Sequence, residues 1–302
     1  MIARAASRRT AETEAPADPC TEVTESDLAR FAEFFHKRTG ITFPPHRSAL
    51  VRKRLGDCIV EYGAASFRDL FLRLRTRPGG PEMQSVINAL TVNETFFYRE
   101  AHQFDQLVKH ALPQVTARRP ANRPVRILSM PCSTGEEPYS IAIYLLENWP
   151  DVDRFDVEII GTDIDTDAIA KARQARYGSR SVSRLPQSAL KRYFRLSSGA
   201  AGYQLVPGVA DAVQLAPSNL LDREIARQFK AIDVVFCRNL LIYFDDSARS
   251  VAMNNLYDCL RPGGYIFVGH SESISRMTSL FEPQRVGEHM LHRKPMRARS
   301  VT

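Results

Sequence analysis

The chain has 302 residues, enough for two modest domains with buried cores. Its 44% hydrophobic and 25% charged content is typical of a globular enzyme, and no apolar run approaches the roughly 20 residues of a membrane-spanning helix, so we expect a cytoplasmic protein without membrane insertion. The net charge of +7 suits nucleic acid or an acidic protein partner, and five scattered cysteines without a Cys-x-x-Cys pair argue against a disulfide framework and a zinc site.

The amino-terminal part predicts a small helical domain behind a flexible leader. Residues 1–23 are rich in Ala, Thr, Glu and Pro and have no periodicity. From Ser26, apolar residues recur at helical spacing until Gly40, and three more periodic segments follow. We therefore predict an all-helical domain over residues 24–91, with helices at 26–39, 46–62, 66–75 and 82–90.

A polar and aromatic segment leads out of this domain. It reads Thr91-Val-Asn-Glu-Thr-Phe-Phe-Tyr-Arg-Glu100 and begins a linker and connecting helix that we place at residues 92–124. Its Asn93, Thr95 and Arg99 surround an aromatic patch, and the segment is too polar to be pure core.

From residue 125, strands alternate with helices, which predicts an α/β domain with a doubly wound, mostly parallel sheet over residues 125–295. The predicted strands are 125–129, 157–161, 232–237, 265–268 and 289–293, and the predicted helices are 137–147, 166–176 and 247–260. The turn-rich stretch at about 193–217 predicts a small antiparallel β insertion, with a plain connecting loop as the alternative. A basic tail, residues 296–302, ends the chain.

The turn after the first strand carries two acids. In Ser129-Met-Pro-Cys-Ser-Thr-Gly-Glu-Glu-Pro-Tyr-Ser140, Glu136 and Glu137 open the helix where a phosphate site would keep bare amides. Acids at this edge suit a ligand with hydroxyl groups and positive charge, such as S-adenosylmethionine. A simple complement to the helix dipole is the alternative, and of the two residues we favour Glu137 as the ligand.

A second acid follows the second strand. Asp163, in Gly161-Thr-Asp-Ile-Asp165, lies about 25 residues past the first turn, where nucleotide-binding sheets place a carboxylate for the ribose hydroxyls. Asp165 is expected to cap the next helix. No Gly-x-Gly-x-x-Gly motif follows the first strand, which favours S-adenosylmethionine over a dinucleotide.

The third buried strand also ends in polar residues. Arg238 and Asn239 follow it directly, and Tyr243 and Phe244 come next, as expected of a pocket wall at the ligand edge of the sheet. An Asn-Pro-Pro-Tyr-like segment, typical of nucleobase amine methylation, is missing here. We therefore expect no nucleic-acid substrate despite the basic charge.

Together these segments resemble the chemotaxis receptor glutamate methyltransferases, the CheR family. The matching pieces are Asn93-x-Thr95-x-Phe97-x-Arg99-Glu100, Ser133-Thr-Gly-Glu-Glu-Pro-Tyr-Ser140, Thr162-Asp-Ile-Asp165, Ser218-Asn-Leu-Leu221, Cys237-Arg-Asn-Leu-Leu-Ile-Tyr-Phe244 and Gly269-His-Ser-Glu272. They occur in family order across about residues 24–295. The resemblance implies a Rossmann-like methyltransferase domain with a β insertion behind a helical domain, in a bacterial signal-transduction enzyme.

The implied activity is methyl transfer from S-adenosylmethionine to receptor glutamates, which leaves S-adenosylhomocysteine. The resemblance implies that Arg99 orients the substrate carboxylate, that Tyr243 lines the transfer site beside it, and that Asp163 and Glu137 bind the cofactor. The remaining cofactor-pocket residues carried over from the family are Asn93, Thr95, Asn219, Leu220, Arg238 and Asn239. Arg99 is assigned both to the catalytic residues and to the cofactor-binding residues.

The implied partners are the glutamate-rich cytoplasmic helices of chemotaxis receptors. A basic helix with Arg47, Lys53 and Arg54 is a candidate recognition surface, with a solvated basic face as the alternative. The β insertion is a second candidate docking surface. Two other functions stay open at this point: the same chemistry on a signalling protein outside chemotaxis, and a non-catalytic regulatory module that binds the cofactor or its product. We expect a monomer.

Overall fold

The structure is a computed structural model that describes residues 22–117, 119–120, 122–197, 202–287 and 289–296. Most of the predicted leader 1–23 and of the predicted tail 296–302 therefore lies outside the described residues. The same holds for residues 198–201 within the predicted insertion.

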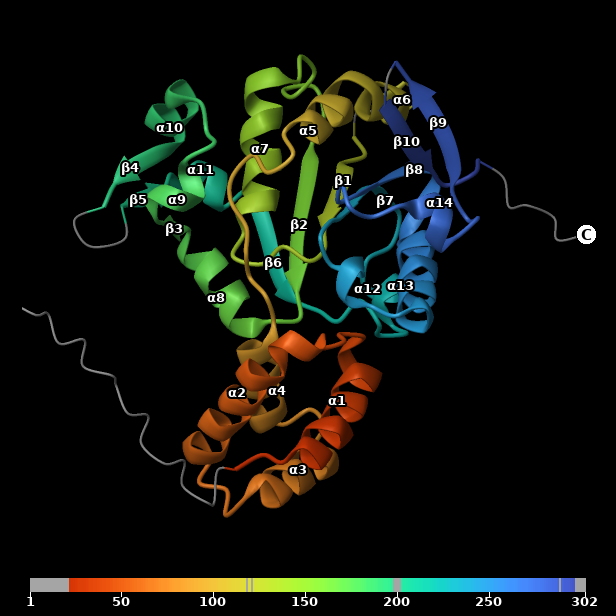
Figure 1. Ribbon diagram of the computed structural model, residues 1–302. Helices are drawn as coiled ribbons and strands as arrows, with labels where there is room; N and C mark the ends of the chain where they lie inside the picture. The colour runs from red at the N-terminus through yellow and green to blue at the C-terminus, as the bar shows by residue number, and fades with distance from the viewer. Residues whose placement is uncertain (1–21, 118, 121, 198–201, 288, 297–302) are drawn as a thin grey trace, which may run out of the picture.

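The amino-terminal domain is a group of helices that lies below the sheet domain in Figure 1. Its helices are α1 (Glu25–Thr39), the short η2 (Pro45–Arg47), α2 (Ser48–Glu61), α3 (Phe67–Thr76) and α4 (Pro81–Leu90). Thr24 begins α1 with a capping box, in which its side chain accepts from the Asp27 amide while the Asp27 carboxylate accepts from Thr24. Gly40 ends α1 in the left-handed conformation, with a φ of 73°.

Gly40 also fixes how the two domains meet. A Cβ atom at this position would lie 2.9 Å from Leu221 Cδ1 and 3.1 Å from the side chains of Phe244 and Ala248, so only glycine allows the approach. Just beyond it, the backbone amide of Thr42 donates to the Tyr243 carbonyl oxygen at 2.9 Å. The end of α1 is thereby held against the segment that follows strand β7 (Ile232–Cys237).

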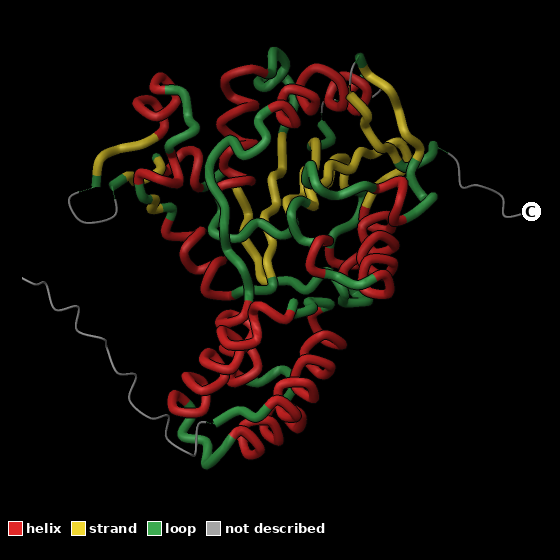
Figure 2. Tube along the Cα trace, viewed as in Figure 1, coloured by secondary structure: helices red, strands yellow, loops and turns green. Residues whose placement is uncertain are grey.

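The second domain is built on a seven-stranded sheet with helices on both sides (Figure 2). The strand order is β6-β2-β1-β7-β8-β10-β9. The first five are parallel, and β10 pairs antiparallel with both β8 and β9. The strands are β1 (Val125–Ser129), β2 (Val157–Asp163), β6 (Val213–Pro217), β7 (Ile232–Cys237), β8 (Leu260–Val268), β9 (Glu282–Val286) and β10 (His289–Arg293).

Successive residues of the central strands face opposite layers of core. Ile127 and Val234 pack with α7 (Glu136–Asn148) and with the connecting helices α5 (His102–Gln106), η3 (Leu107–Ala111) and α6 (Leu112–Thr116). Leu128 and Val235 pack instead with α13 (Asp246–Cys259) in a core that continues into the amino-terminal helices. Because side chains alternate between the two faces of each buried strand, only one face of the sheet shares its hydrophobic core with the helical domain.

The antiparallel insertion differs in place from the prediction of 193–217. The small sheet has the order β3-β5-β4, formed by β3 (Arg176–Tyr177), β5 (Tyr203–Leu205) and β4 (Phe194–Leu196). Val213–Pro217 is not part of it, since this strand pairs in parallel with β2 at the edge of the main sheet. The insertion therefore begins near residue 176, after α8 (Thr166–Gln174), and includes α9 (Ser179–Val182), α10 (Gln187–Tyr193) and α11 (Pro207–Ala210).

The helices of the described ranges are all too short or too polar to cross a membrane.

Candidate active site

Two adjoining cavities lie at the carboxyl ends of β1, β2 and β7, against the amino-terminal domain. We call them the first and second cavity. The first is lined by Asp163, Asn93, Asn219, Leu220, Tyr243 and several apolar side chains, and the second by Arg99, Thr95, Glu137 and Arg238. Val92, Pro131, Ser133 and Asn239 line both. The ligand edge predicted from the three strand ends is therefore present as two cavities that share a wall.

Asp163, the last residue of β2, lies in the first cavity and is 5% exposed. Its carboxylate accepts the backbone N–H of Ser133 at 2.7 Å and that of Asp165 at 2.9 Å. Burial raises the pKa of Asp163 to about 6, although these amides favour its charged form. Asp165 caps α8, as predicted, by accepting the amides of Asp167 and Ala168 at 2.9 Å.

The two acids at the start of α7 point to different neighbours. Glu137 lines the second cavity and accepts the Ser129 hydroxyl at 2.8 Å. Glu136 accepts the hydroxyls of Thr134 at 2.6 Å and of Ser181 at 2.8 Å, and this fixes α9 of the insertion. Burial raises the pKa of both carboxyl groups. Glu137 is thus the acid available to a ligand, and Glu136 supports the fold around it.

Arg238 is the buried cation of the second cavity, with a side chain that is only 2% exposed. Its Nη1 lies 3.1 Å from Glu137 Oε2, and its Nη2 lies 3.6 Å from Glu100 Oε2 and donates to the Arg99 carbonyl at 2.6 Å. The guanidinium lies over the Phe104 ring, 5.7 Å from its centroid. Among the described residues, its Nε has no hydrogen-bond partner, and its Nη1 has the Glu137 carboxylate as its charged neighbour, so the buried Nε donor is left unsatisfied.

Arg99 reaches the second cavity from a tight turn in which Tyr98 and Glu100 have φ angles of 59° and 53°. Its Nη1 donates to the Glu94 carbonyl at 2.9 Å, and its guanidinium lies 5.8 Å from the centroid of the Phe96 ring. Carbonyl and aromatic contacts leave most of the planar donor fork of Arg99 available for a carboxylate.

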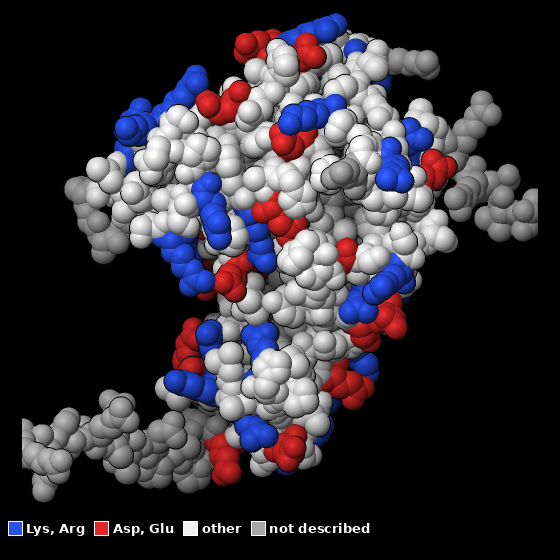
Figure 3. All heavy atoms as spheres, turned by 45° about the horizontal axis from the view of Figure 1, so that its top comes forward, with Lys and Arg blue, Asp and Glu red and all other residues white. Residues whose placement is uncertain are grey.

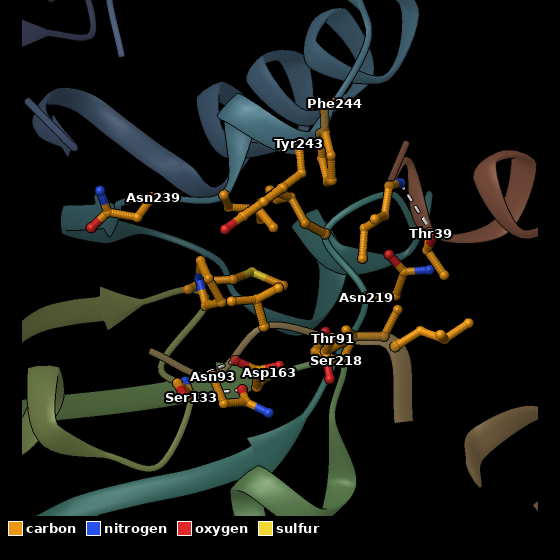
Figure 4. Close-up of a pocket in the computed structure, with 18 of the residues that line it drawn as sticks. Thr39, Thr91, Asn93, Ser133, Asp163, Ser218, Asn219, Asn239, Tyr243 and Phe244 are labelled. Atoms are coloured by element: carbon orange, nitrogen blue, oxygen red, sulfur yellow. Dashed lines mark hydrogen bonds between the residues drawn. The ribbon is translucent and has the colours of Figure 1, made fainter. Parts of the chain in front are cut away.

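The segment after β7 is held by a buried carboxylate. Glu272 Oε2 accepts the backbone amides of Asn239 at 2.9 Å and of Gly269 at 2.7 Å, and Oε1 accepts that of Ile242 at 3.3 Å. This holds Asn239 at a φ of 59° and directs the Tyr243 side chain into the first cavity, across from Asp163 (Figure 4).

The amino-terminal domain supplies part of the first cavity. Thr39, Ile41 and Leu90 line it beside the residues of the sheet domain. Asn93, in the linker that leaves this domain, is fixed to the sheet domain, since its amide donates to Asp165 at 2.6 Å and its carbonyl oxygen accepts the Ser133 hydroxyl at 3.0 Å. The site is therefore complete only when the two domains are packed together.

Two family models match the chain in succession. The CheR methyltransferase all-alpha domain matches residues 26–91, and the CheR methyltransferase SAM binding domain matches residues 93–289. The chain belongs to the CheR methyltransferase family. This confirms the resemblance and the predicted fold class, and it makes S-adenosylmethionine the cofactor of the second domain.

The chain is also similar to proteins that are named chemotaxis protein methyltransferases. The chain is 45% identical to chemotaxis protein methyltransferase 2 of Vibrio cholerae over 92% of this chain and 96% of the relative. It is 36% identical to chemotaxis protein methyltransferase 2 of Pseudomonas aeruginosa, over 85% and 90%, and 32% identical to chemotaxis protein methyltransferase of Escherichia coli, over 86% and 88%.

The cavities of this CheR protein fit a zwitterionic nucleoside. The unsatisfied Nε donor of Arg238 suits a carboxylate, and Glu137 beside this guanidinium suits an ammonium group. The first cavity combines the Asp163 carboxylate with apolar walls such as Met130 and Leu240, which suit ribose hydroxyls and an adenine ring.

Every predicted site residue lines one of the two cavities, but Arg99 and Tyr243 do not share one. Of the basic-helix residues, Arg47 lines the first cavity and Arg54 lines a groove between the domains, whereas Lys53 is exposed elsewhere on α2. Glu100 and Glu272 belong to matching segments, yet sequence reasoning gave them no role. Their place in these segments was the signal in the sequence that could have identified Glu100 and Glu272. Nothing in the sequence around Thr39, Ile41 and Leu90 indicated that these residues would line the first cavity.

Proposed function

We propose that this CheR protein transfers the methyl group of S-adenosylmethionine to glutamate side chains on the cytoplasmic region of methyl-accepting chemotaxis receptors, and so provides sensory adaptation. The supporting observation is the two-domain family match together with Arg99, Glu137 and Arg238 in one cavity beside Asp163. The two other functions left open by the sequence gain no support, since the relatives are named as chemotaxis methyltransferases.

In this proposal the chain's own residues hold the cofactor at three points. Asp163 accepts the ribose hydroxyls, Glu137 binds the amino group, and Arg238 binds the carboxylate through its unsatisfied Nε donor. The other pocket residues are Asn93, Thr95, Asn219, Leu220 and Asn239. The bound cofactor supplies a methyl group on a positively charged sulfur.

Methyl transfer to a carboxylate needs orientation more than proton transfer. A glutamate side chain has an ordinary pKa of about 4.3 and is already ionised at neutral pH, so no general base is required. Arg99 holds the attacking carboxylate in line and offsets the loss of its hydration. Tyr243 lines the first cavity and borders the transfer site on the side opposite Arg99.

Receptor recognition in this proposal uses the basic side of α2, from which Arg54 reaches the groove between the domains. Arg47, which ends η2 just before α2, and Lys53, exposed elsewhere on α2, add positive charge to the same region. The β insertion, whose edge strand β4 exposes Leu196, is a second docking surface. We propose a monomer that acts in the cytoplasm and has no nucleic-acid substrate.

Incubation of the purified chain with tritium-labelled S-adenosylmethionine and receptor-containing membranes tests the proposal. We expect label on the receptor that mild alkali releases as methanol, because alkali hydrolyses methyl esters. The Arg99→Ala variant is the matched control and is expected to leave the receptor unlabelled. Alkali-stable label, or label on another protein alone, would contradict the proposed substrate.

A further inference from the structure

A polar groove runs between the two domains beside the transfer site. We call it the interdomain groove. Its volume is about 1030 Å³, and Glu94, Thr95 and Phe96 line both it and the second cavity, where Arg99 lies. Figure 3 shows Lys and Arg side chains gathered around this hollow, with acidic side chains between them. A partner in the groove would therefore lie directly at the entrance to the transfer site.

The interdomain groove has one wall from each domain. The amino-terminal wall carries Arg54, whose Nη1 donates only to the Ala89 carbonyl, at 2.8 Å. The opposite wall belongs to the sheet domain and carries Lys171 of α8 and Arg184, two residues after the end of α9. Within the described part of the chain, none of these three cations forms an ion pair.

The acids of the interdomain groove do not neutralise these cations. Glu94 is paired with Arg180 at 2.9 Å. Asp165 is buried and holds the α8 cap together with the side chains of Thr91 and Asn93. Asp167 is the remaining exposed acid that lines the groove. The exposed charges of the groove are therefore positive in excess.

The sheet-domain wall is fixed to the active site. Ser181 of α9 donates its hydroxyl to Glu136, at the start of α7, at 2.8 Å. The Ser181 carbonyl accepts the amide of Phe97, two residues before Arg99, at 2.9 Å. Arg184 follows three residues later, so the same contacts that hold the Arg99 turn also set the position of this wall.

We propose that Lys171 and Arg184 bind carboxylates of the substrate helix other than the one that is methylated. Two turns of helix, roughly 10 Å wide and 11 Å long, occupy about 900 Å³, which the interdomain groove can hold. Acidic residues three or four positions apart lie on one helix face and can meet Lys171 and Arg184 on the sheet-domain wall while one glutamate enters the second cavity. This inference rests on the proposed function and assigns selectivity for acidic helices to α8 and the segment after α9.

Lys171→Glu and Arg184→Glu, singly and together, test this in the full-length protein with tritium transfer to receptor membranes. We expect the KM for receptor to rise about fivefold for each variant and more for the double variant, with kcat within about twofold, because surface charges act mainly on encounter and binding. Cofactor affinity, measured by calorimetry, stays unchanged. Arg285→Glu on β9, at the far edge of the sheet, is the control of equal charge.

A second measurement keeps this inference separate from the proposed function. Fluorescence anisotropy compares the binding of a glutamate-rich helical peptide and its glutamine counterpart, with no turnover required. If the double variant binds the acidic peptide more weakly and the glutamine peptide as before, Lys171 and Arg184 bind carboxylates of the helix. This conclusion holds even if the wild-type protein labels no receptor. Equal binding of both peptides by the wild type, or an equal effect of Arg285→Glu, overturns it.

Discussion

Replacement of Arg238 by methionine tests the electrostatic centre of the site. Methionine has a similar length but no charge, so Arg238→Met leaves Glu137 and Glu100 buried without their shared cation. Breaking a buried ion pair by removing one partner costs about 3–5 kcal/mol. With an unfolding entropy of about 2.1 cal/mol/K per residue over 302 residues, this lowers Tm by about 5–8 °C.

The assays are thermal unfolding and calorimetric titration with S-adenosylmethionine. Arg238→Met should lower both Tm and cofactor affinity, and adding Glu137→Gln should restore part of the Tm because it removes the stranded charge. Cofactor affinity should stay low in that double variant. Arg227→Met is the control, since its ion pair with Glu224 is exposed.

A Tm shift below about 2 °C in Arg238→Met, the size expected for an exposed pair, would contradict a buried ion-pair role for Arg238. Full restoration of cofactor binding by the second substitution would also contradict the assigned roles of Glu137 and Arg238.

Five further predictions concern cofactor and substrate. Arg99→Ala should leave cofactor affinity within about threefold by calorimetry and nearly abolish tritium transfer, because Arg99 acts on the substrate carboxylate. Asp163→Ala should lose measurable cofactor binding. In the wild type, affinity should fall as the pH drops below about 6, since burial raises the pKa of Asp163 to about 6 and only its charged form is a strong acceptor. Arg54→Glu should raise the KM for receptor with cofactor binding unchanged. Gly269→Ala should reduce activity, since its Cβ atom would lie 2.8 Å from Asn239 Nδ2 and displace that residue.

Each of these predictions has an outcome that contradicts it. Lost cofactor binding in Arg99→Ala would move this residue into the cofactor pocket. A flat affinity profile between pH 5 and 8 would separate Asp163 from the cofactor, and unchanged receptor kinetics in Arg54→Glu would leave the basic side of α2 as a solvated surface. Wild-type activity in Gly269→Ala would show that Asn239 is free to shift.

The sequence alone determined the central strands and the residues at their ends. The prediction for β1 at 125–129 and for β7 at 232–237 matches the structure residue for residue, because continuous apolar runs between polar turns have few alternatives inside a parallel sheet. Parallel strands end at one edge, so polar residues that follow them must gather there. Asp163, Glu137 and Arg238 could be selected for that reason.

Contacts between segments that lie far apart in the sequence became known only from the folded structure. Val213–Pro217 is half-exposed, so its pattern fits either an insertion or the edge of the main sheet, and only pairing with β2 decides between them. Thr39, Ile41 and Leu90 are ordinary helix-end residues in sequence and enter the site through domain packing. Likewise, the placing of Arg99 and Tyr243 in separate cavities depends on the turn after Phe96 and on Glu272, which local propensity does not encode.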